Sequence, residues 1–105
     1  MPISVAGFDW DDGNSDKCGK HGLTLAEIES VFHGTVMVLP DEDHSEAEQR
    51  FKAIGRTSAG RYVFIVYTLR RRGGQFLIRP ISARYMHRKE VAHYEKQNEK
   101  ENPEV

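Results

Sequence analysis

The clearest pattern of apolar and polar positions follows Thr24 and predicts a helix over residues 24–33. Thr24 is a favourable N-cap, and Glu27, three residues later, completes a capping box. Gly34 suits the left-handed conformation that ends many helices. Such a helix buries one face on the rest of the protein. The apolar residues at the spacing of this face are Leu25, Ile28, Val31 and Phe32.

Short apolar and β-branched segments elsewhere in the chain predict strands. Residues 61–69 are apolar on both faces, which is typical of a covered central strand. Gly73 and Gly74 favour a hairpin turn, because glycine adopts the positive φ that such turns need. Pro80 has no amide hydrogen for a ladder, so its strand lies at an edge or is bulged there. The predicted strands are residues 3–8, 35–39, 50–57, 61–69 and 75–84.

The remaining segments are shorter or more polar. Residues 14–20 predict one or two helical turns that end at Gly22, and residues 87–97 predict a final helix. Residues 41–48 are acidic and predict a loop. Residues 98–105 offer no apolar anchor, and we expect them to form a disordered tail.

Length and composition favour one small domain. The chain has 105 residues, and we expect residues 1–97 to form a compact single α+β domain, an antiparallel sheet meander with packed helices. No apolar stretch approaches the roughly 18 residues of a membrane span, and the first residues lack the pattern of a secretory signal. Cys18 is the single cysteine, which excludes an intramolecular disulfide and a cysteine-based zinc site. We therefore expect a reduced, cytoplasmic protein that does not enter membranes.

The formal net charge of −1 conceals a strong sorting of charge along the sequence. Residues 1–49 contain two Lys, no Arg and eleven acidic residues, a balance of −9. Residues 50–94 contain nine Arg, two Lys and one Glu, a balance of +10. Such asymmetry indicates an anionic partner or a nucleic acid. The alternative is a solvated surface whose arginines pair with the acidic first half.

The predicted strands bring several of these cations together. Side chains alternate along a strand, so every second residue of 50–57 shares one face. Guanidinium groups stay charged and bind phosphate oxygens in bidentate fashion. Arg79 interrupts an apolar strand, where a charge is costly without a partner. The pattern predicts a phosphate-binding surface made from Arg50, Lys52, Arg56, Arg61, Arg79 and Arg84.

Proton transfer and metal binding have fewer candidates. His21 beside Lys20 fits an acid or base next to a positive charge, or the cationic end of a short helix. Glu48 lies two residues from Arg50, which either positions it as a base or neutralises it. The acidic loop matches a calcium loop only at its start, and His44 with Glu48 supplies too few ligands for another metal. No metal or cofactor is therefore expected.

Several short motifs follow one another in a specific order along residues 7–95. They are FDWD near the start, KHG at 20–22, TLAEIESVF in the predicted helix, DEDHSEAEQRFKAIG at 41–55, VYT at 66–68 and ISAR at 81–84. This ordered set resembles the BrnT family of bacterial type II toxins. Pro80 departs from the family pattern, in which an aliphatic residue is usual before the ISAR segment.

The resemblance implies a RelE-like ribonuclease toxin that cleaves RNA and arrests growth. It also implies a BrnA-like antitoxin with a ribbon-helix-helix domain, which binds operator DNA so that toxin and antitoxin together repress their own promoter. We expect a heterotetramer of two toxins and two antitoxins. The positions that match the family pattern are Trp10, Lys20, His21, His44, Glu48, Arg50, Arg79 and Arg84.

These residues suit RNA cleavage without a metal ion, because RNA carries its own nucleophile, the 2′-OH. We expect this oxygen to attack the adjacent phosphorus and leave a 2′,3′-cyclic phosphate, with arginines on the phosphate and Glu48 or His21 moving the proton. The alternative is a non-catalytic binding module or co-repressor subunit that holds a protein or nucleic acid on the basic sheet. The expected catalytic residues are Lys20, His21, Glu48, Arg50, Arg79 and Arg84; the expected substrate-binding residues are Trp10, Lys52, Arg56 and Arg61.

Overall fold

A computed structural model describes residues 5–41 and 48–101 of the chain, with side chains as far as residue 97. This part holds three α-helices, a short 3-10 helix and one sheet of five strands, which confirms the α+β class. In chain order the elements are β1 (Val5–Phe8), α1 (Asp12–Cys18), the 3-10 helix η1 (Gly19–His21), α2 (Leu25–Phe32), β2 (Val36–Pro40), β3 (Phe51–Arg56), β4 (Tyr62–Arg72), β5 (Gln75–Tyr85) and α3 (Arg88–Glu101).

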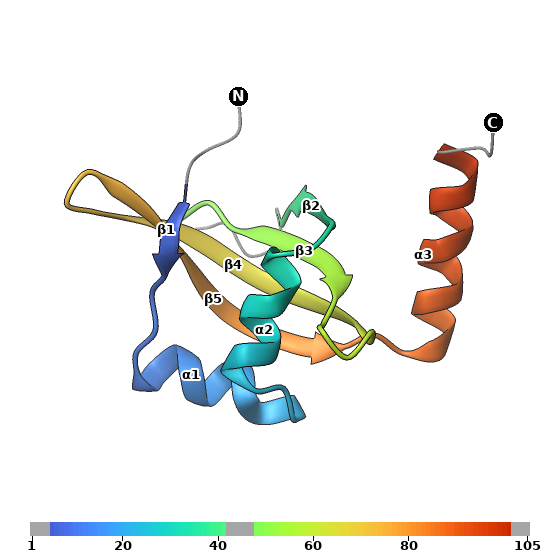
Figure 1. Cartoon of the computed structure of the whole chain (residues 1–105), viewed down its shortest axis with the longest axis horizontal. Coiled ribbons are helices and arrows are strands. Elements are labelled where there is room, and N and C mark those ends of the chain that lie inside the picture. The colour runs from blue at the N-terminus through green and yellow to red at the C-terminus, as the bar shows by residue number, and fades with distance from the viewer. Residues whose placement is uncertain (1–4, 42–47, 102–105) are drawn as a thin grey trace.

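The sheet has the strand order β1-β5-β4-β3-β2 (Figure 1). The strands β3, β4 and β5 form the predicted antiparallel meander, and β2 adds to it by pairing antiparallel with β3. β1 differs, because it lies at the edge and runs parallel to β5. The short apolar segment of β1 carries no information about its partner, which follows some 70 residues later. The first residues of the predicted strand 3–8 lie outside the described part.

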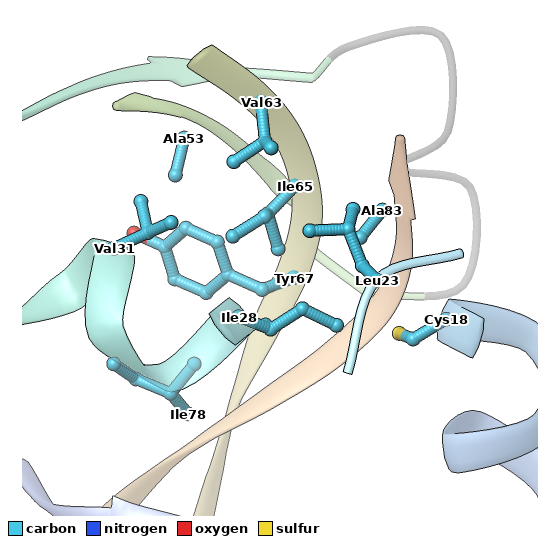
Figure 2. Close-up of a cluster of buried hydrophobic side chains, with 10 residues drawn as sticks. All are labelled: Cys18, Leu23, Ile28, Val31, Ala53, Val63, Ile65, Tyr67, Ile78 and Ala83. Carbon is cyan, nitrogen blue, oxygen red and sulfur yellow. The ribbon is translucent and has the colours of Figure 1, made fainter. Parts of the chain in front are cut away.

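The core fills the space between α2 and one face of the sheet, with α1 closing its end (Figure 2). Ile28 and Val31 on α2 are fully buried, as the helical pattern predicts, and they pack on Val63 and Ile65 of β4. The same cluster extends to Cys18, Leu23, Ala53, Tyr67, Ile78 and Ala83. We call this side of the sheet the core face.

The capping box predicted for α2 is present. The Thr24 hydroxyl accepts from the Glu27 amide at 3.1 Å, and Glu27 accepts from the Thr24 amide at 2.9 Å. The short helical segment before it also forms, as α1 followed by η1. Gly22 then ends η1 with a φ of 91°, in the left-handed region that the prediction assigned to it. Two local signals in the first third of the sequence therefore correspond to real helix boundaries.

Pro80 lies at a bulge in β5, which is one of the two positions that the sequence allowed. Tyr67 pairs with Pro80 while its neighbour Val66 pairs with Ser82, so Ile81 is the extra residue. The missing amide hydrogen causes no gap in the ladder, because β1 has already ended opposite Ile78. The Pro80 carbonyl is bound instead by the Asn14 side chain, 2.8 Å away.

The bulge also decides which side chains of β5 share a face. Ala53, Ile65 and Ala83 align across β3, β4 and β5 on the core face. One residue further along, the row of Ile54, Phe64 and Arg84 lies on the opposite side, which we call the second face. The helix α3 stands at one end of the sheet (Figure 1) and contacts the second face through the rings of Tyr62 and Tyr94, 5.4 Å apart.

The helix α3 runs to Glu101, four residues beyond the predicted end at residue 97. The expected tail therefore begins within this helix, and residues 102–105 lie outside the described part. None of the helices in the described ranges is long and apolar enough to cross a membrane. The likeness of the whole fold to RelE toxins stays a prediction.

Candidate functional site

A cavity of about 220 Å³, with charged and apolar side chains in its lining, opens on the second face beside the C-terminal half of β5. It collects residues from η1, from the segment after β2 and from three strands. We call it the His21 hollow, and its lining residues are His21, Asp41, Lys52, Phe64, Val66, Ser82, Ala83 and Arg84.

The phenyl ring of Phe64 holds the two cations of the His21 hollow. The Lys52 ammonium lies 5.4 Å from the ring centroid, and the Arg84 guanidinium carbon lies 4.6 Å from it. Register explains the arrangement, because Arg84 is paired with Phe64, and Lys52 is paired with Val66 two residues along β4. Cations near an aromatic face are attracted by its quadrupole. Two positive charges thus gather at one ring, and the carboxylates of Asp41 in the lining and of Glu90 beside Arg84 offset part of that charge.

Arg84 is held from the opposite side by Glu90 of α3. Its Nη1 and Nη2 donate to the two carboxylate oxygens, each at 2.9 Å, and Nη1 also donates to the Tyr85 carbonyl. This bidentate pair lowers the pKa of Glu90 to about 2, chiefly through the hydrogen bonds from Arg84 and secondarily through the His87 amide. The same hydrogen bonds raise the pKa of Arg84, so both groups are charged at neutral pH.

His21 reaches the hollow because its neighbours in the sequence are anchored. It is the last residue of η1 and is itself exposed, but Cys18 and Leu23 on either side of it are buried in the core. Burial raises the pKa of the Cys18 thiol to about 11, so this side chain acts as an apolar anchor. The segment between these anchors is short, and it places His21 in the same cavity as Ser82 and Ala83 of β5.

Asp41 and Arg50 close the segment that lies between β2 and β3. The Asp41 amide donates to the Arg50 carbonyl at 2.9 Å, which continues the ladder one step beyond the strands. Asp41 is buried and lines the His21 hollow. Residues 42–47, which include the family-pattern residue His44, lie outside the described part.

A second, more apolar groove of about 530 Å³ adjoins the hollow and separates α3 from the sheet. Phe64 lines both cavities, and the Arg84–Glu90 pair links them, since Arg84 lines one and Glu90 the other. The sheet side of this groove comes from Met37, Leu39, Ile54 and Phe64, and the helix side includes Lys89, His93 and Tyr94.

The structure gathers three of the predicted site residues, His21, Lys52 and Arg84, in one cavity. Lys20 is the exposed neighbour of His21 and does not line it. The Arg50 carbonyl accepts the hydrogen bond from the Asp41 amide that closes the segment between β2 and β3. The other predicted residues whose side chains the structure describes have partners elsewhere in the fold.

Arg79 lies between two carboxylates that the first part of the chain supplies. Its Nη1 is 3.0 Å from Asp11 and 3.7 Å from Asp9, and its side chain is only 16% exposed. Arg72 adds a further contact to Asp9 at 3.1 Å. Glu48 likewise forms an ion pair within the fold, because its carboxylate lies 3.2 Å from the guanidinium of Arg70 on β4. These contacts match the alternative in which the arginines pair with the acidic half.

The remaining substrate-binding candidates are also partnered within the fold. Arg56 donates to the Tyr62 hydroxyl at 2.9 Å on the second face, away from the hollow. Arg61 stacks 3.6 Å from the centre of the Tyr85 ring, which faces the core side. Trp10 packs against the core, and its indole donates to Glu29 of α2 at 2.9 Å.

Sequence reasoning did not select Phe64, Ser82, Asp41 or Glu90 as part of the site. Phe64 sits in an apolar run that was assigned to the core, and only the register shows that its face is turned away from α2. Ser82 is two residues before Arg84, a spacing that could have indicated a shared face. Glu90 carried a signal too, because it is the one acidic residue among residues 50–94.

Comparison with known proteins agrees with the motif order. The family model described as the ribonuclease toxin BrnT of type II toxin-antitoxin systems matches residues 10–90. No individual curated protein matches the chain. The matched range includes every element from α1 to β5 and the start of α3. The chain belongs to the BrnT family of ribonuclease toxins of type II toxin–antitoxin systems.

Proposed function

We propose that the His21 hollow is the RNA-cleaving site of this toxin. The observation that carries the proposal is the meeting of His21, Lys52 and Arg84 in one cavity on the second face. A phosphodiester needs a positive environment for the charge that develops on phosphorus, and it needs a group that moves protons. The hollow combines both kinds of group.

In the proposed reaction the 2′-oxygen of one nucleotide attacks the adjacent phosphorus and the bond to the 5′-oxygen of the next nucleotide breaks. The products are a 2′,3′-cyclic phosphate and a 5′-hydroxyl. Arg84 and Lys52 bind the phosphate oxygens, and their charges stabilise the transition state more than the substrate. His21 transfers the proton between the reacting oxygens and solvent. The attacking and leaving oxygens both belong to the RNA, so we propose a metal-independent reaction.

The other predicted residues take supporting roles in this proposal. Lys20, next to His21, adds positive charge at the rim of the hollow. Arg79 holds the segment of Asp9 and Asp11, and Glu48 is bound by Arg70. These contacts make His21 a better proton-transfer group than Glu48.

The test is cleavage of a defined RNA by protein made in a cell-free system, which avoids both toxicity and bound antitoxin. The assay contains EDTA, and the ends of the products are mapped. We expect cyclic phosphate ends, and a loss of about a hundredfold or more in rate for His21→Ala and for Arg84→Ala. His33→Ala is the matched control, because His33 is an exposed histidine at the end of α2 that does not line the hollow. Loss of cleavage in EDTA with recovery on added metal would contradict metal independence.

We further propose that a BrnA-like ribbon-helix-helix antitoxin neutralises this toxin in the cytoplasm, and that two copies of each protein form the complex. Family membership supports an antitoxin partner. A ribbon-helix-helix domain is itself a dimer, which accounts for the proposed 2:2 stoichiometry and for joint repression of the promoter.

This partnership is tested by co-expression with a ribbon-helix-helix protein encoded next to the toxin. We expect restored growth, co-purification with a mass of two plus two chains in light scattering, and a shift of promoter DNA by the complex. A neighbour that neither binds the toxin nor restores growth would exclude that protein as the antitoxin.

A further inference from the structure

The bidentate pair between Arg84 and Glu90 restricts the conformation of the guanidinium group at the hollow. Arg84 comes from the end of β5 and Glu90 from the first turn of α3, with a sharp change of chain direction between them. A long arginine side chain that is 40% exposed has many rotamers of similar energy. The two 2.9 Å hydrogen bonds and the contact with Phe64 select one of them.

The geometry of the pair leaves a defined part of the guanidinium for a ligand. Glu90 accepts from the Nη1 and Nη2 ends, and the Tyr85 carbonyl accepts from Nη1. In the described part of the chain no acceptor lies at Nε of Arg84. An arginine offers five N–H donors in a fixed fork, so the edge between Nε and Nη2 stays available for a phosphate.

Glu90 is itself fixed by the backbone of its own helix. Its Oε1 accepts from the His87 amide at 2.8 Å, which is the hydrogen bond of a residue that caps the start of α3. The carboxylate therefore has a set position before any ligand binds. The ion pair of Glu95, on the same helix, does not have this geometry: Glu95 lies 3.9 Å from Arg56, and both side chains are at least half exposed.

We infer that Glu90 is a positioning residue for RNA cleavage: it holds the Arg84 fork over Phe64 with the Nε edge directed to the substrate phosphate. The inference rests on the proposed function of the His21 hollow. Glu90 touches no substrate in this arrangement and acts only through Arg84. Preorganised donors lose no energy to reorientation during the reaction, and an error of about 1 Å in such a group costs up to a hundredfold in rate.

The test compares Glu90→Gln with Glu95→Gln in the RNA cleavage assay. Glutamine keeps an acceptor for the His87 amide, so the cap of α3 survives while the charged bidentate pair is lost. We expect Glu90→Gln to lower kcat at least tenfold with little change in KM, because ground-state attraction between RNA and the cations persists. Glu95→Gln removes the same charge from the same helix and should leave kcat unchanged. Melting curves of Glu90→Gln and of a second variant, Glu90→Asp, show whether a loss of kcat comes from unfolding of the protein.

A double-mutant comparison separates a positioning role from a structural one. If Glu90 acts through Arg84, then adding Glu90→Gln to Arg84→Ala causes no further loss. An additional loss, an unchanged kcat for Glu90→Gln, or a faster reaction would overturn the inference; a faster reaction would mean that Glu90 competes with phosphate for Arg84. If Arg84→Ala itself cleaves RNA at the normal rate, the proposed site fails and this inference fails with it.

Discussion

The Arg79 guanidinium lies 3.0 Å from the Asp11 carboxylate, at the point where the chain leaves β1 and enters α1. The two residues are 68 positions apart in the sequence. Arg79 holds the pKa of Asp11 below its usual value, chiefly through its hydrogen bond to the carboxylate. The charge of Arg79, within the apolar part of β5, is thus paired with carboxylates of the acidic N-terminal segment. Part of the charge asymmetry along the sequence is therefore neutralised by ion pairs inside the fold.

Arg79→Ala should therefore lower stability as well as any activity. The substitution leaves Asp9, which is only 13% exposed, with Arg72 as its remaining arginine partner. We expect a melting temperature several degrees below that of the unaltered protein, measured by circular dichroism. Arg71→Ala is the control, because Arg71 is exposed and has no carboxylate partner among the described residues. Equal melting temperatures for the two variants would show that the Arg79 pairs contribute nothing measurable.

Asn14→Ala should destabilise the protein by about 2 kcal/mol, because the Asn14 amide serves two buried or half-buried carbonyls. Its Nδ2 donates to Pro80 at 2.8 Å and to Asp9 at 3.0 Å, and its Oδ1 accepts from the Asp11 amide. Urea unfolding provides the measurement. Ser15→Ala, next along α1, removes only an exposed 3.4 Å hydrogen bond and should change the free energy by less than about 0.5 kcal/mol. A similar loss in both variants would contradict a specific role for Asn14.

Gly55→Ala should cost about 1–3 kcal/mol of unfolding free energy, because β3 passes close to α2 at this residue. A Cβ at Gly55 would lie 2.9 Å from Val31 Cγ1 and 3.2 Å from the Thr35 carbonyl oxygen. Denaturant unfolding measures the loss. Gly19→Ala is the matched control, since a Cβ there meets no atom within 4 Å and the backbone φ is −80°. If Gly55→Ala left the free energy of unfolding unchanged, α2 would have to shift on the sheet without cost.

The Glu90–Arg84 pair predicts a specific dependence of stability on pH. The pKa of Glu90 is lowered from 4.5 to about 2 in the folded protein, first of all by Arg84. A depressed carboxylate pKa stabilises the fold above the unfolded value, and this contribution disappears as the pH falls through the folded value. The difference in unfolding free energy between the unaltered protein and Glu90→Gln should therefore have its largest value at pH 6 and should decrease as the pH falls from about 4.5 to 2. A difference that is constant over this range would exclude the charged pair as its source.

The sequence predicted the elements well where the signal was local. Thr24 and Glu27 form the capping box that their spacing indicates, and Gly22 takes its predicted left-handed conformation. The meander of β3, β4 and β5 follows from apolar runs separated by glycine turns. The parallel pairing of β1 was not predicted, because the choice of a partner depends on how the helices between β1 and β2 pack.

The candidate site was predictable only in part. Arg84, Lys52 and His21 were selected by residue type, and the fold brings them into one cavity. Arg79 and Glu48 were selected by the same reasoning, yet each faces an opposite charge from a distant segment. Composition counts charges but does not pair them, so it shows neither the Arg79–Asp11 pair nor the Arg84–Glu90 pair, and it does not show which of the two arginines lines a cavity.

The sequence by itself determined the family, the α+β class and the helix boundaries at Gly22 and Thr24, because ordered motifs, apolar spacing and capping residues act over a few neighbouring positions. It did not determine the ends of α2 and α3: α2 ends at Phe32 with His33 as its cap and without a left-handed Gly34, and α3 continues to Glu101. Only the tertiary structure decided which cations share a cavity. The bulge at Ile81 sets the face of Arg84, and the buried anchors Cys18 and Leu23 carry His21 to it. Glu90 completes the arrangement from another element, since strand register and helix packing place side chains at distances that the sequence does not encode locally.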